Sequence, residues 1–110
     1  MPLPGAADWE RAAGRWLLEA CPPDYHAYDV LRRHPVVLAR FAAMQVAAAQ
    51  EATRRGLATA RDELRGQVPA EAVEAAVLVL EREGRRLARL GREVELVYAA
   101  LRGEHYVPRL

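Results

Sequence analysis

The sequence predicts an all-α fold, in which two long helices form an antiparallel hairpin and a shorter helix precedes them. Ala and Leu, both strong helix formers, occur 22 and 14 times in 110 residues. Proline and glycine interrupt the helical pattern at two places, Cys21–Asp24 and Gly66–Pro69. Between and after these breaks, apolar residues recur at helical spacing. Together these observations place three helices in one domain over residues 1–110.

The first helix is expected from Ala7 or Asp8 to Ala20. Asp8 suits the N-cap position, and Glu10 would lie in the first turn. One face of this helix is apolar and carries both tryptophans: Trp9, Ala12, Ala13, Trp16, Leu17 and Ala20. The prolines of Cys21–Asp24 end the helix. A short helical piece over Tyr25–Arg33 is expected to follow.

The second helix is expected from Pro35 to about Arg65, because proline suits a first helical turn. Its apolar face shifts around the axis near Arg54-Arg55-Gly56. The helix therefore either kinks at Gly56 or packs its two halves against different neighbours. The face of the first half is expected at Val37, Phe41, Met44, Ala48 and Ala52, and that of the second half at Thr53, Leu57, Ala60 and Leu64.

The third helix is expected from Pro69 or Ala70 to Arg102, with Gly103 as the cap residue beyond it. Two glycines, Gly84 and Gly91, lie on its apolar face. Mid-helix glycine costs about 1 kcal/mol relative to alanine, so we expect a neighbour to approach closely there. The predicted helix-packing or dimer seam has strict 4-3 spacing: Val73, Val77, Leu80, Gly84, Leu87, Gly91, Val94, Tyr98 and Leu101.

The lengths of these helices predict self-association. A helix of about 30 residues is about 45 Å long, whereas a compact globule of this chain length is about 35 Å across. The apolar arc of the third helix also widens past its seam, through Ala76, Val79, Leu90 and Val97. A second copy would cover this surface, so we expect a homodimer with a four-helix core. Residues 1–6 are expected to be a flexible N-terminus, and residues 103–110 an extended tail.

Composition excludes several chemistries. The chain has no Ser and no Lys, so a serine nucleophile, a Schiff base and a P-loop are ruled out. Its single cysteine cannot form an intrachain disulfide. The N-terminus lacks a signal-peptide pattern, and the longest nearly uncharged run, residues 41–50, is too short to span a bilayer. All 16 basic residues are Arg, which indicates the codon bias of a GC-rich genome. We expect a cytoplasmic, bacterial protein with no membrane contact and no cofactor.

An arginine stripe is the clearest polar feature of the third helix. Guanidinium groups match phosphate and carboxylate geometry, so the stripe is a candidate surface for an anion or an acidic partner. Nearby glutamates at helical spacing favour a solvated face instead, through Glu81–Arg85, Glu83–Arg86, Arg89–Glu93 and Arg92–Glu95. The stripe comprises Arg82, Arg85, Arg86, Arg89 and Arg92, and Arg54, Arg55 and Arg61 of the second helix are a possible extension.

The segment around His26 is dense in functional side chains. His26 and Asp29 are placed to share a metal or a ligand, with His34 or Glu51 completing the site. The alternative is that Tyr25, Tyr28, Val30 and Leu31 pack this segment onto the helices. Cys21 is either a nucleophile with His26 as base or a small buried apolar residue. The tryptophans could line a ligand cleft, and the tail residues Tyr106, Val107 and Leu110 could bind a partner.

These patterns favour a non-enzymatic helical module that scaffolds or regulates another protein and acts as a homodimer. Catalytic residues are not expected. The first alternative is a nucleic-acid-associated protein that uses the arginine stripe, although the net charge is only +1. The second alternative is a small-ligand or metal binder built around His26 and Asp29.

Overall fold

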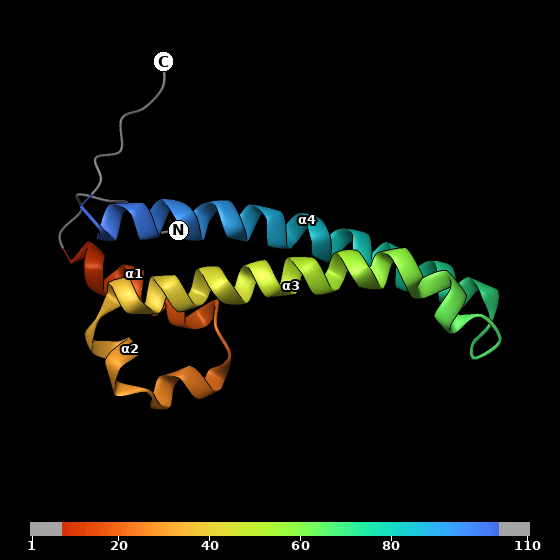
Figure 1. The fold of residues 1–110 in the computed structure, drawn as a ribbon, viewed down its shortest axis with the longest axis horizontal. Coiled ribbons are helices and arrows are strands. Elements are labelled where there is room, and N and C mark those ends of the chain that lie inside the picture. The colour runs from red at the N-terminus through yellow and green to blue at the C-terminus, as the bar shows by residue number, and fades with distance from the viewer. Residues whose placement is uncertain (1–7, 104–110) are drawn as a thin grey trace, which may run out of the picture. The chain divides into compact units, whose positions relative to one another are not determined.

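A computed structural model describes residues 8–103 of the chain (Figure 1). It confirms the all-α prediction: α3 and α4 are two long helices packed antiparallel, and a shorter N-terminal helix precedes them. The elements are α1 (Trp9–Glu19), the 3₁₀ helix η1 (Pro23–Ala27), α2 (Asp29–Arg33), α3 (Pro35–Leu64) and α4 (Ala70–Leu101). The predicted flexible N-terminus and the tail beyond Gly103 lie outside the described residues.

Proline and glycine set the ends of the long helices, as expected. The His34 carbonyl accepts hydrogen bonds from the Val37 and Leu38 amides at 2.9 and 3.1 Å, and so begins α3 directly at Pro35. Gly66 has a φ of +82° in the turn between α3 and α4, a left-handed conformation that suits glycine. Gly103 has the same φ of +82° just after α4.

The predicted side-chain cap of α1 is wrong. Asp8 has φ 60° and ψ 21°, and its carboxylate makes no capping hydrogen bond to the described first turn. N-cap side chains reach the first turn from an extended backbone, which a left-handed residue does not provide. The Asp8 carbonyl instead accepts the Ala12 amide at 3.1 Å.

We expected one domain over residues 1–110, and the chain divides into two compact units that are described separately. The first comprises Met1–Gln45 and Gly91–Leu110, of which residues 8–45 and 91–103 are described. Its core draws on every α-helix: the buried side chains are Ala13, Leu17, Cys21, Leu31, Leu38, Ala39, Ala42, Val94 and Val97. The apolar face predicted for α1 supplies two of them, and Trp9 and Trp16 are half-buried beside them.

The second unit, Val46–Leu90, consists of the later part of α3, the turn, and the earlier part of α4. Val46 and Ala60 of α3 are buried, as are Val73, Val77 and Leu87 of α4. Two helices packed along one seam leave their outward faces uncovered. Leu78 and Val79 of α4 are accordingly 56% and 64% exposed.

The buried face predicted for the first half of α3 is wrong. Phe41 is 39% exposed and Met44 is 52% exposed, and Ala48 and Ala52 are also exposed. The buried residues in this part of α3 are Leu38, Ala39, Ala42 and Val46 instead. One stripe of buried or half-buried positions continues along the whole helix, without the expected shift: Leu38, Ala42, Val46, Ala49, Thr53, Gly56, Ala60 and Leu64. The helix is a single α-helix from Pro35 to Leu64, through Gly56.

Among residues 8–103, no atom makes the close approach expected at Gly84. A Cβ atom placed on Gly84 would lie 3.9 Å from Thr53 Cγ2, which is an ordinary van der Waals contact. The nearer contact is at Gly56, where a Cβ would lie 3.6 Å from Leu80 Cδ2. Neither glycine is therefore required by crowding within the hairpin.

We predict that Gly84→Ala stabilises the protein by about 0.5–1 kcal/mol, because alanine is the better helix former and its Cβ fits. Urea unfolding followed by circular dichroism measures the change. The matched control is Gly66→Ala, which also meets open space but has φ +82° and should destabilise. A destabilised Gly84→Ala variant would contradict this packing of α3 on α4.

Candidate functional site

The arginine stripe of α4 is exposed along its whole length. Arg86 is paired with Glu83 through two hydrogen bonds, one of them Nε to Oε2 at 3.0 Å. Among residues 8–103, Arg82, Arg85, Arg89 and Arg92 have no carboxylate within 4.0 Å. Of the four predicted pairs, only Glu83–Arg86 therefore forms in the described structure. The other arginines are available to an external acidic group.

A groove of about 540 Å³ runs along the second unit between α3 and α4. Leu57, Leu80 and Ala88 supply apolar lining, and Gly84 lies among them. Arg85 and Glu81 add charge from α4, while Arg54 adds a guanidinium that is already paired with Glu51 at 2.9 Å. The groove thus brings seam residues and one stripe arginine to the same place. Its chemistry suits an apolar side chain that carries, or lies beside, an anionic group.

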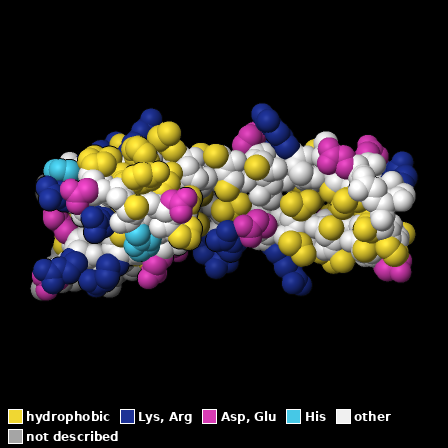
Figure 2. Space-filling view, turned by 90° about the horizontal axis from the view of Figure 1, so that it is seen from below, with side chains coloured by type: hydrophobic (Ala, Val, Ile, Leu, Met, Phe, Trp, Pro, Cys, Tyr) yellow, Lys and Arg dark blue, Asp and Glu magenta, His cyan; other side chains and the backbone are white. Residues whose placement is uncertain are grey.

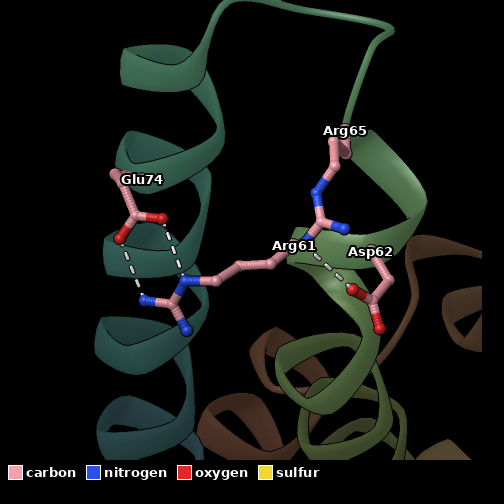
Figure 3. A network of polar contacts seen from close by, with 4 residues as sticks. All are labelled: Arg61, Asp62, Arg65 and Glu74. Atoms are coloured by element: carbon pink, nitrogen blue, oxygen red, sulfur yellow. Dashed lines mark hydrogen bonds and ion pairs between the residues drawn. The ribbon is translucent and has the colours of Figure 1, made fainter.

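An ion pair links the two helices near the turn (Figure 3). Arg61 donates two hydrogen bonds to the Glu74 carboxylate, from Nε to Oε2 and from Nη2 to Oε1, both at 2.9 Å. These hydrogen bonds lower the pKa of Glu74 and raise that of Arg61. The neighbouring Arg65–Asp62 pair, at 3.3 Å, stays within α3. Arg61 was a candidate for the anion surface, and its pairing with Glu74 was not predicted from the sequence.

Aromatic side chains gather on the first unit. The Tyr25 ring centroid lies 5.8 Å from that of Tyr28 and 6.0 Å from that of Phe41, in tilted and edge-on geometry. Tyr28 and Val30 are each 52% exposed, whereas Leu31 is buried as expected. Figure 2 shows further apolar side chains at the surface of the face that it draws. Leu31 and Tyr25 anchor this segment, whereas Tyr28 and Val30 remain exposed to solvent.

The residues expected to hold a metal or ligand are already engaged or exposed. The Asp29 carboxylate pairs with Arg32 at 3.2 Å and Arg33 at 2.9 Å, and His26 and His34 are exposed. Glu51 pairs with both Arg54 and Arg55. Across residues 8–103, no three His, Cys, Asp or Glu side chains are arranged to hold a metal ion.

Cys21 is buried at the end of α1, and this burial raises the pKa of its thiol. A raised pKa lowers the thiolate fraction, which is the form that reacts as a nucleophile. The environment of Cys21 therefore suits a small buried apolar residue better than a nucleophile. The tail residues Tyr106, Val107 and Leu110 lie outside the described residues.

Comparison with protein-family models, curated proteins and solved structures found no match to this chain. None of the helices in the described part of the chain combines the length and the apolar character needed to cross a membrane. A functional proposal therefore depends on the surfaces described above.

We predict a pH-dependent contribution from the Arg61–Glu74 pair. Because the pKa of Glu74 is lowered in the fold, its stabilisation is present at neutral pH and is lost as pH falls through the folded-state pKa. The free energies of unfolding of the wild type and of Glu74→Gln, measured by urea titration, should therefore differ near pH 7 and become equal in acid. The pair is exposed, so the difference should be small. A difference that persists unchanged in strong acid would contradict this account.

Proposed function

We propose that this protein is a non-enzymatic helical interaction module that acts as a homodimer and scaffolds or regulates a protein partner. The observation that carries the proposal is the amount of large apolar surface left open by the described residues. Nine large hydrophobic side chains are at least 39% exposed: Tyr28, Val30, Val36, Phe41, Met44, Val68, Leu78, Val79 and Leu96.

The energetics support association. Full burial of a Val, Leu, Met or Phe side chain contributes about 1.5–3 kcal/mol. Contiguous exposed apolar groups mark interaction surfaces, and Leu78 and Val79 are consecutive exposed residues of α4. The second unit supports the same view, because its two helix segments bury a single seam, and a further helical layer would cover the outward faces. A second copy supplies such a layer without any additional component.

The proposal predicts that the purified protein has twice the chain mass of 12.3 kDa at micromolar concentration. Light scattering behind a sizing column measures the mass, and a dilution series gives the dissociation constant. Apolar association also predicts that moderate salt leaves the dimer largely intact, since screening acts on charges. A monomer across the whole concentration range would contradict the homodimer.

A further inference from the structure

The outward face of α4 in the second unit carries a second 4-3 repeat, opposite the buried seam. We name its residues the α4 strip, and all of them are exposed: Glu71, Ala75, Leu78, Arg82, Arg85 and Arg89. Arg85 lies at the edge of the strip and also borders the groove between α3 and α4. Spacing of 4-3-4-3-4 aligns side chains along one line of a helix that packs on another helix. Val79, at 64% exposed, lies beside Leu78 and widens the apolar part.

Charge is distributed unevenly along the α4 strip. Its first position is acidic, its middle is apolar, and its last three positions are basic. Within residues 8–103, neither Glu71 nor Arg82, Arg85 or Arg89 has an ion-pair partner. The neighbouring charged residues of α4 are already paired, because Glu74 forms an ion pair with Arg61 and Arg86 forms one with Glu83. The strip therefore offers one free carboxylate and three free guanidinium groups around an apolar centre.

We propose that a second copy of this chain docks on the α4 strip in antiparallel orientation, with the part from Glu71 to Arg82 of one strip against the same part of the other. In this arrangement Leu78 faces Ala75 of the partner copy, and Glu71 faces Arg82 of the partner copy. The two-fold axis then crosses the α4 helices at the level of Ala76 and Val77. Each contact therefore occurs twice in the dimer. A large apolar side chain thus packs on a small one, and a carboxylate lies opposite a guanidinium group. This inference rests on the proposed homodimer and names its surface.

Charge complementarity selects this occupant and this orientation. A parallel copy would place Glu71 against Glu71 and each free arginine against its equivalent, which is repulsive. A nucleic acid would be attracted to the arginines, but it would also meet Glu71 and the exposed Leu78 and Val79. An antiparallel copy satisfies the acidic end, the apolar centre and the first arginine together.

Complementary charge reversals test the proposal. Glu71→Arg and Arg82→Glu each replace two attractive contacts with two repulsive ones, so each variant alone should raise the dimer dissociation constant at least about tenfold. An equimolar mixture of the two variants restores both contacts and should form a heterodimer close to wild-type affinity. Analytical ultracentrifugation measures the dissociation constant of each variant and of the mixture. Because both positions are exposed, circular dichroism should show unchanged helix content.

Matched controls carry the same charge changes away from the strip. Glu63→Arg and Arg40→Glu lie at exposed positions of α3 and should dimerise like the wild type, alone and mixed. Leu78→Asp, which removes the apolar centre, should not be rescued by mixing with either α4 variant.

The outcomes separate the two proposals. A wild-type dimer that both reversals leave intact, or a mixture that fails to associate, overturns the α4 strip but leaves the homodimer standing. A wild-type monomer overturns both. A monomer that binds a DNA duplex, with an affinity that falls steeply with salt, would assign the arginines to nucleic acid instead.

Discussion

The second unit depends on the packing of small side chains of α3 against the seam of α4. Gly56 lies opposite Leu80, Thr53 lies opposite Gly84, and Gln50 donates a hydrogen bond from Nε2 to the Leu87 carbonyl at 3.3 Å. These contacts share one register, which the tight turn around Gly66 sets. The same register brings Arg61 to Glu74 and closes the hairpin next to the turn. A change of register would separate every one of these partners.

A hairpin held by one seam has a direct consequence for its outer surface. The first unit places α1, α2 and parts of α3 and α4 around a shared core, and there Val97 of α4 is 2% exposed. In the second unit nothing among the described residues covers the outward side of α4, and Val79 is left open. The exposed apolar and charged groups are thus a product of the architecture, and they make α4 a surface suited to another helix.

Much of the fold was predictable from the sequence, and the failures have physical causes. Helix ends were predicted within a few residues, because proline and glycine act locally on the backbone. The buried face of the first half of α3 was not predicted correctly, because alanine lies on nearly every side of that helix. The large Phe41 and Met44 were assigned to the buried face, although both are exposed. The Arg61–Glu74 pair followed from the hairpin register, which the turn alone could have given. The division into two units depends on tertiary packing, which periodicity does not report.

The central claim is that the second unit is completed by association through α4. Amide hydrogen exchange over residues 70–90, measured at low and high protein concentration, tests it most directly. Association that stabilises the hairpin should slow exchange across this segment as concentration rises, because a partner that binds the folded form suppresses its local opening. Exchange rates that are identical at all concentrations would contradict the claim.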